Sequence, residues 1–231
     1  MPAFATTPPP PKRLLVFARL PEIGKVKTRL AQSIGEDKAL AVYEAMLRDL
    51  LESIGAPTAD TEIEVVWAPT PEANGATLRR AFGDRPLAMQ TGSSLGDRLA
   101  MAFSERFFFA RALKIVVIGV DDPSLPRELI DRAFSLLDAC EWVIGPATDG
   151  GYYLLGARAA SFESAVFAGV PWGTPSVLET TMEKIRSWGN TVAVLPVRSD
   201  IDAEADLRRF AKTGEAGGAL RSLLQAWGWC E

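Results

Sequence analysis

The sequence contains no histidine. This absence excludes Ser-His-Asp and Cys-His catalysis, histidine proton shuttles and histidine metal ligands. Any acid, base or metal ligand must therefore be a carboxylate, a lysine, a tyrosine, a cysteine, a backbone group or water. The two cysteines, Cys140 and Cys230, are far apart and form no CxxC pair, so we interpret them as reduced thiols and expect no thiolate zinc site.

Excess positive charge and long hydrophobic runs are also absent. The formal net charge is -4 at pH 7, so the chain has no overall basic field, and we expect no nucleic-acid partner. The longest apolar run, residues 115–120, is far shorter than the roughly 20 residues that cross a bilayer. Residues 1–11 lack the charged region and the apolar stretch of a secretory signal. We therefore expect a cytoplasmic protein without a membrane span.

The composition is that of a folded protein with a sizeable core. Of the 231 residues, 48% are hydrophobic and 23% are charged. Four consecutive prolines, residues 8–11, follow small residues, and we interpret residues 1–12 as a flexible proline-rich tail. Residues 13–231 are then expected to form one domain, and no oligomeric state is predicted.

Short apolar runs alternate with helical patterns along this domain. The runs predict strands at residues 14–18, 62–67, 87–90, 114–119, 142–144 and 191–195. The helical patterns cover residues 28–54, with an interruption at Gly35, and residues 71–82, 95–109, 126–137, 175–188 and 203–229. Strands separated by helices need crossovers, so we predict an α/β fold with a mainly parallel central sheet and helices on both faces. Ligands bind beyond the carboxyl ends of such strands, which makes the following loops important.

The loop after the first predicted strand is rich in cations. Arg19, Lys25, Lys27 and Arg29 surround the start of a helix near Thr28, where unpaired backbone N–H groups favour an anion. A phosphate group suits this environment, although the segment is neither a Walker loop nor a GxGxxG fingerprint. A solvated basic loop is the alternative interpretation.

The loop after residues 114–119 carries adjacent carboxylates, Asp121 and Asp122. Two acids at the carboxyl end of a strand suit a hard cation such as Mg²⁺ or Mn²⁺, held jointly with phosphates of a substrate. The same residues, followed by Pro123, Ser124 and Pro126, also fit an ordinary turn and helix start. Facing a cationic phosphate loop, the metal interpretation is the better one.

A third loop combines an acid with paired glycines and two tyrosines. Asp149, Gly150 and Gly151 precede Tyr152 and Tyr153. Glycines let the backbone approach a ligand closely, and tyrosines offer flat faces and hydroxyls suited to a sugar. A hairpin turn leading into a strand explains the same residues, and the two interpretations are compatible.

The acidic segment at residues 200–206 precedes the last helical region. Asp202 in this segment fits a helix N-cap and fits a second metal contact equally well. Both interpretations stay open on the sequence alone.

Six stretches, in this order along the chain, carry a family resemblance: FARLPEIGKVKTRLA, GDRLAMAF, GVDDPSLP, GPATDGGYYLLG, PWGT and DIDAEADL. With them, residues 13–210 resemble the DUF2064 family, a glycosyltransferase-like family of the GT-A, or nucleotide-diphospho-sugar transferase, superfamily. That family is similar to the guanylyltransferases of coenzyme F420 and molybdenum-cofactor biosynthesis. The resemblance implies a single GT-A (Rossmann-like) domain that binds a nucleotide at the carboxyl edge of its sheet, with Mg²⁺ or Mn²⁺.

The resemblance also implies roles for single residues. Lys27 and Arg29 stand where the superfamily contacts donor phosphates. Asp121 matches the acid that binds metal, and Asp202 lies where a second metal contact or a ribose contact is made. The acceptor or the sugar would be framed by Asp149, Gly150 and Gly151.

The leading prediction is glycosyl transfer from a nucleotide-diphospho-sugar to a small-molecule acceptor. The metal on Asp121, together with Lys27 and Arg29, would neutralise the departing diphosphate, which requires no proton transfer by the protein. Asp149 is the predicted base if the acceptor hydroxyl needs one. The alternative is a nucleotidyltransferase, in which an acceptor phosphate attacks a nucleoside triphosphate and pyrophosphate leaves. A nucleotide-binding protein without turnover is the second alternative.

Overall fold

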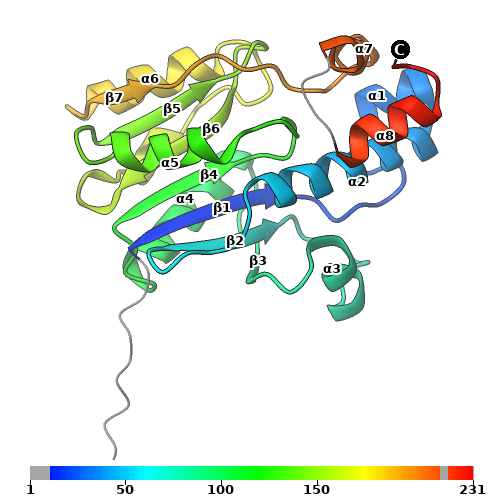
Figure 1. The fold of residues 1–231 in the computed structure, drawn as a ribbon. Helices are drawn as coiled ribbons and strands as arrows, with labels where there is room; N and C mark the ends of the chain where they lie inside the picture. Colours follow the sequence, from blue (N-terminus) through cyan, green and yellow to red (C-terminus); the bar gives the residue numbers. More distant parts are fainter. Residues whose placement is uncertain (1–10, 214–217, 231) are drawn as a thin grey trace, which may run out of the picture.

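The computed structural model describes residues 11–213 and 218–230, in which seven strands form one sheet of order β3-β2-β1-β4-β6-β5-β7 (Figure 1). The strands are β1 Lys12–Ala18, β2 Thr61–Trp67, β3 Leu87–Met89, β4 Lys114–Ile118, β5 Trp142–Pro146, β6 Tyr152–Arg158 and β7 Val192–Val194. All neighbours pair in parallel except β6, which is antiparallel to both β4 and β5. The predicted mainly parallel sheet is confirmed.

The strand β6 is absent from the strands predicted above. It follows the Asp149–Gly150 turn directly, so β5 and β6 form a hairpin between two parallel neighbours. The turn was recognised in the sequence, but its position inside the sheet depends on long-range pairing with β4.

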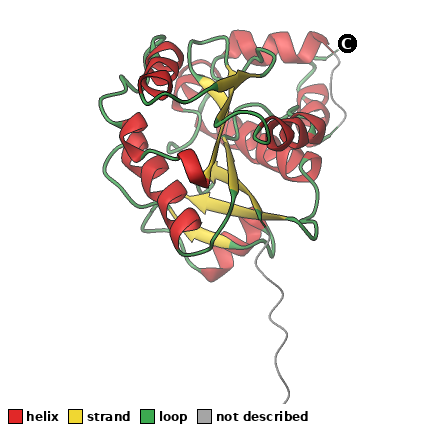
Figure 2. Cartoon of the chain, turned by 90° about the vertical axis from the view of Figure 1, so that its left-hand side faces the viewer, coloured by secondary structure: helices red, strands yellow, loops and turns green. Residues whose placement is uncertain are grey.

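Helices cover both faces of the sheet, as predicted (Figures 1 and 2). The α-helices are α1 Thr28–Ile34, α2 Glu36–Ser53, α3 Gly75–Phe82, α4 Leu95–Phe108, α5 Arg127–Leu136, α6 Val177–Ser187, α7 Glu204–Thr213 and α8 Ala219–Ala226. Two short 3-10 helices span Ala159–Ser161 and Ser164–Phe167. None of the helices in the described part of the chain has the length and apolar character needed to cross a membrane.

Alternating side chains of the strands fill two cores. On β1, Leu14 and Val16 join the core beneath α1, α2, α5 and α8, whereas Leu15 joins the core beneath α4 and α6. All three of these side chains are fully buried. This arrangement explains why the strand reads as a continuous apolar run.

Helix ends follow local signals in the sequence. Gly35 adopts a positive φ of 86° and separates α1 from α2, which confirms the predicted interruption. Asn74 and Ser94 cap α3 and α4 with reciprocal capping boxes, so α3 begins later than residue 71. The predicted helical region 203–229 consists of α7 and α8, and residues 214–217 between them lie outside the described residues.

The predicted tail also lies mostly outside the described residues, which exclude residues 1–10. The predicted boundary at residue 12 differs from the structure, because Lys12 is the first residue of β1. Pro11 already belongs to the fold, since its carbonyl accepts hydrogen bonds from the backbone of Leu113 and Lys114. These bonds fix the start of β1 beside the start of β4.

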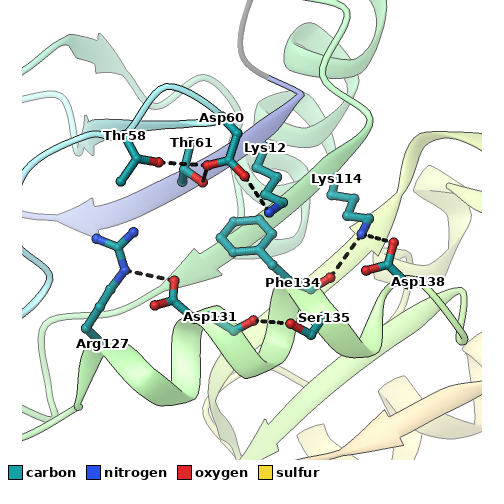
Figure 3. Close-up of polar contacts among 10 residues, drawn as sticks. All are labelled: Lys12, Thr58, Asp60, Thr61, Lys114, Arg127, Asp131, Phe134, Ser135 and Asp138. Atoms are coloured by element: carbon teal, nitrogen blue, oxygen red, sulfur yellow. Dashed lines mark hydrogen bonds and ion pairs between the residues drawn. The ribbon is translucent and has the colours of Figure 1, made fainter.

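Charged side chains at the amino edge of the sheet form separate pairs (Figure 3). Lys12 at the start of β1 contacts Asp60 at 2.7 Å, and Lys114 at the start of β4 contacts Asp138 at 2.5 Å. Hydrogen bonds from Lys12, Thr58 and Thr61 hold the pKa of Asp60 well below its usual range. Each lysine at this edge therefore has its own carboxylate.

Candidate functional site

A cleft of about 650 Å³ lies at the opposite, carboxyl edge of the sheet. The loop after β1 and the loop after β4 both contribute to its wall, as does the segment before α7. Six of the residues predicted from the sequence line this cleft: Arg19, Lys25, Lys27, Arg29, Asp121 and Asp202. The predicted convergence of the cationic loop and the acidic loop is confirmed.

Lys27 lies at the centre of this convergence. Its ammonium group is 2.5 Å from Asp121 Oδ1 and 3.0 Å from Asp202 Oδ1. It also donates a hydrogen bond of 2.5 Å to the carbonyl oxygen of Ile201. Only 4% of the side chain is exposed. One cation from the start of the chain thus holds two carboxylates and a carbonyl from distant segments.

The pKa of Lys27 reflects two opposed effects. Burial lowers the pKa, because an apolar environment disfavours the charged form. The negative charges of Asp121 and Asp202, and the hydrogen bonds that these groups accept, outweigh burial, so the pKa lies above its ordinary value of 10.5. Lys27 is therefore a permanent cation in this site.

The backbone at Lys27 is unusual for a residue with a side chain. It adopts φ 46° and ψ 45°, the left-handed conformation, immediately before the first residue of α1. This conformation costs roughly 1–2 kcal/mol for a residue other than glycine. Strained backbone persists where surrounding contacts determine it, and here the contacts are the bonds to Asp121, Asp202 and Ile201.

The loop after β4 is fixed to the segment before α7. The backbone N–H of Ile201 donates to the carbonyl of Asp121 at 2.9 Å. The neighbouring acid, Asp122, is only 5% exposed and accepts hydrogen bonds from the Ser124 backbone and hydroxyl. It also forms an ion pair with the Arg198 guanidinium. Asp122 therefore holds the loop in place, while the side chain of Asp121 faces the cleft.

Two further cations extend the positive wall of the cleft. Arg29 is largely exposed and lies 3.6 Å from Asp202 Oδ2. The Arg19 guanidinium donates to the carbonyl of Lys25 at 3.4 Å, which links both ends of the loop. Tyr43 accepts a hydrogen bond from the Arg19 backbone N–H and donates one to the Arg19 carbonyl, so α2 anchors the loop.

Asp200 is a residue whose importance the sequence did not reveal. Burial raises its pKa, and the negative charges of Asp149, Asp202 and Asp121 raise it further, to about 6. Neither Asp149 nor Asp200 forms an ion pair within the described residues. Several carboxylates therefore share this side of the site with few cations. The two-residue spacing of Asp200 and Asp202 is the signal that could have indicated it.

The third predicted loop lines the cleft in part: Tyr152 and Tyr153 line it, whereas Asp149, Gly150 and Gly151 do not. A Cβ atom on Gly150 would lie 2.2 Å from the Pro175 carbonyl oxygen, so this glycine permits the loop to pack against that backbone. The Asp149 carboxylate accepts a hydrogen bond from the Gly151 N–H at 2.8 Å. These contacts give Asp149, Gly150 and Gly151 a structural role in the loop. Their predicted roles toward a sugar or an acceptor stay predictions.

The residues present fit a divalent cation that is shared with a substrate. Within the described residues, no group of three or more acids or cysteines has the arrangement of a complete metal site. Asp121 and Asp202 offer hard oxygen atoms, and the Lys27 ammonium between them demonstrates that this corner accommodates positive charge. Mg²⁺ in nucleotide sites takes one or two carboxylates and completes its shell with phosphates and water.

The family follows from comparison of the chain with known proteins. Residues 54–174, just over half of the chain, match the family described as "Uncharacterized protein conserved in bacteria (DUF2064)". This chain belongs to the DUF2064 family. The resemblance recognised in the sequence is therefore confirmed.

A curated relative of this DUF2064 protein is the 3-phospho-D-glycerate guanylyltransferase of Phenylobacterium zucineum (strain HLK1). The two sequences are 30% identical over 134 residues, which cover 58% of this chain and 61% of that relative. The chain thus matches less than two thirds of the relative's length.

Solved structures extend the comparison to nearly the whole chain. A protein from Desulfovibrio desulfuricans G20, provisionally named a nucleotide-diphospho-sugar transferase, superposes with a TM-score of 0.88. It is 32% identical, and the match covers 94% of this chain and 95% of that one. A 4-diphosphocytidyl-2C-methyl-D-erythritol synthase superposes with a TM-score of 0.54 at 14% identity, covering 84% of this chain and 93% of that one, and shares the fold alone.

These comparisons confirm the predicted fold class, a single GT-A-type sheet. Both relatives near 30% identity carry transferase names, in agreement with the predicted class of enzyme.

Proposed function

We propose that this DUF2064 protein is a metal-dependent transferase that moves a sugar from a nucleotide-diphospho-sugar to a hydroxyl acceptor. The observation that carries the proposal is the meeting of Lys27 with Asp121 and Asp202 in one cleft at the carboxyl edge of the sheet. Ligands of open α/β sheets bind at this edge. The provisional name of the Desulfovibrio relative supports the same donor class.

Lys27 and Arg29 supply the positive charge that such a reaction needs. The bond between the sugar carbon and the diphosphate oxygen breaks with its electron pair going to the diphosphate. A preorganised ammonium stabilises that negative charge without reorganisation. A divalent cation held by Asp121 and Asp202 would supply Lewis-acid stabilisation of the same leaving group.

The acids on the other side of Asp121 favour a neutral acceptor. Asp149 and Asp200 have no cationic partner in the described part of the chain, and their charges add to those of Asp121 and Asp202. An acceptor phosphate would be repelled by this field, whereas a sugar or alcohol hydroxyl would not. The acceptor oxygen forms the new bond to the sugar carbon, and its proton passes to water or to a carboxylate. Asp149 is the base that the sequence predicts, but neither Asp149 nor Asp200 is among the residues that line the cleft.

Nucleotidyl transfer is the second candidate, because the relative in Phenylobacterium is named a guanylyltransferase. In that reaction the acceptor phosphate would bond to the α-phosphorus of a nucleoside triphosphate, and pyrophosphate would leave. Lys27 and Arg29 would then stabilise pyrophosphate in place of a nucleoside diphosphate.

The products of the reaction distinguish these candidates. Purified protein is incubated with a panel of nucleotide sugars or nucleoside triphosphates, with Mn²⁺ or with a chelator. Metal-dependent release of a nucleoside diphosphate, with water as a slow acceptor, supports glycosyl transfer. Release of pyrophosphate supports nucleotidyl transfer and overturns the first proposal. Binding that raises the thermal midpoint without any turnover indicates a non-catalytic nucleotide-binding protein.

A further inference from the structure

The cleft has a second end, which the predicted site residues do not occupy. It lies across β2 and β3, where Gln90 follows β3 and Ala68 follows β2. Neighbouring strands lie about 4.8 Å apart, so β2 and β3, two and three strands from β4, place this end roughly 10–15 Å from the β4 loop that carries Asp121. A nucleoside whose phosphates lie near Lys27 would therefore place its base at the end over β2 and β3.

This second end is apolar with a few fixed polar groups. Phe17, Leu95 and Leu99 contribute apolar surface, and Leu95 is 45% exposed although it lines the cleft. An exposed leucine at the mouth of a cleft offers a surface for a flat ring. Gln90 and Arg98 supply the polar groups, whereas the other cations of the cleft lie on the loop after β1.

Gln90 orients Arg98 from beneath. The Gln90 side chain is buried at 7% exposure, and its amide nitrogen donates to the carbonyl of Val66 at 2.8 Å. The amide oxygen is therefore left to face Arg98, whose Nη1 lies 3.5 Å away. The Nε of Arg98 donates to the carbonyl of Gly92 at 3.2 Å. Two of the five guanidinium N–H groups are thus held by the protein.

Gly92 permits this contact. Its φ is 133°, and a Cβ atom there would lie 2.7 Å from the Asp97 Cβ and 2.8 Å from the Arg98 backbone nitrogen. Only glycine lets the loop approach the first turn of α4 closely enough for its carbonyl to reach Arg98. The loop between β3 and α4 is therefore built to hold this arginine.

We propose that Arg98 is the residue that selects the nucleobase, and that the base is guanine. The proposal rests on the proposed nucleotide-dependent function. Arg98 lines the cleft, and within the described residues its Nη2 group and the second N–H of Nη1 have no protein partner, which leaves two adjacent donors for a ligand. A planar guanidinium fork matches the adjacent O6 and N7 acceptors of guanine, which is the commonest specific arginine contact to a base. Adenine presents a donor beside N7, and so cannot accept two bonds from this fork.

The test measures binding of nucleoside diphosphates and of inorganic pyrophosphate, in the presence of Mg²⁺, by isothermal titration calorimetry. We expect the wild-type protein to bind GDP about tenfold more tightly than ADP, UDP or CDP. In Arg98→Gln the affinity for GDP should differ from those for ADP, UDP and CDP by no more than about threefold, while the affinity for pyrophosphate stays unchanged. Arg98→Lys keeps the charge and loses the fork, so it too loses the preference for guanine.

Arg29→Gln is the matched control, because Arg29 lines the phosphate end of the same cleft. This variant should weaken GDP, UDP and pyrophosphate binding together and keep the preference for guanine. If Arg98→Gln weakens pyrophosphate as much as GDP, Arg98 contacts phosphate and the proposal is wrong. A wild-type preference for another base also overturns it. Selective GDP binding without any transfer, in contrast, contradicts only the proposed function.

Discussion

The two edges of the sheet use lysine and aspartate differently. At the amino edge, Lys12 and Lys114 each contact one exposed carboxylate (Figure 3). At the carboxyl edge, the buried Lys27 is shared by Asp121 and Asp202, and more acids lie beside them. One-to-one surface pairs contribute little and require no ligand. A buried cation shared among acids, next to a cleft, is an arrangement that a charged ligand can complete.

The strongest test of this difference removes each lysine. We expect Lys27→Met to lower kcat/KM for the donor by about 10²–10³-fold, because it deletes the preorganised cation that faces the leaving diphosphate. Lys12→Met, at the amino edge, should leave kcat/KM unchanged. Steady-state kinetics on both purified variants checks this, and equal losses in the two would show that the edges do not differ in function.

The next test replaces one aspartate at each edge of the sheet by asparagine. Asp121→Asn should abolish the part of the nucleotide-induced thermal shift that depends on Mn²⁺, since it replaces a candidate carboxylate ligand by a neutral amide and leaves the fold intact. Asp138→Asn is the control at the amino edge and should retain the full shift. Differential scanning fluorimetry with and without Mn²⁺ gives the answer. An unchanged metal dependence in Asp121→Asn would remove this residue from the site.

The ion pair of Asp122 with Arg198 at the carboxyl edge has a structural role, and we expect its removal to affect stability. Asp122→Ala leaves the Arg198 guanidinium without its carboxylate and removes the acceptor for Ser124. We expect the free energy of unfolding to fall by about 2 kcal/mol. Urea denaturation followed by circular dichroism measures this change. A loss no larger than that of an exposed surface pair would mean that Asp122 does not anchor the loop.

Asp200 should show the opposite pH dependence from an ordinary paired acid. Its pKa is raised from 3.8 to about 6, so the folded protein holds a proton that the unfolded chain releases between these values. Stability should therefore decrease as the pH rises through this window. Asp200→Asn removes the effect and should stabilise the protein at pH 7 by about 1 kcal/mol, since solvent screens half of this group. A variant that is less stable at pH 7 would contradict this account.

The smallest expected effect on stability is that of Asp60 at the amino edge, and its dependence on pH is opposite to that of Asp200. Its lowered pKa means that the pairs with Lys12, Thr58 and Thr61 stabilise the fold above the ordinary value of 3.8 and are lost as the pH falls below it. Asp60→Asn should thus be slightly less stable than the wild type at neutral pH, and the two should converge in acid. Thermal midpoints of both proteins measured from about pH 1 to pH 7 check this, because the contribution of Asp60 is lost only gradually below pH 3.8.

The sequence could predict the meeting of Lys27 with Asp121 because the carboxyl ends of parallel strands share one edge. That rule needs only the order of strands and loops. It could not predict that β6 runs antiparallel between β4 and β5, because this depends on pairing between segments far apart in the chain.

Other parts of the site depended on contacts that no local pattern encodes. The packing of Gly150 against Pro175 decides that Asp149, Gly150 and Gly151 do not line the cleft. The raised pKa of Asp200 arises first from its burial and then from acids on three segments of the chain. Gln90 and Arg98 belong to a segment whose sequence looks like the start of an ordinary helix, and only the fold places them over the ends of β1 and β2.

The link from Lys27 to Asp202 also sets the order in which the protein can mature on the ribosome. Synthesis proceeds from the first residue onward, and the ammonium group that needs partners is made long before Asp202. Until residues 201 and 202 have emerged, the strained turn before α1 has Asp121 but lacks the two other contacts that hold it. A chain truncated before residue 201 should therefore leave the turn at Lys27 without two of its three partners.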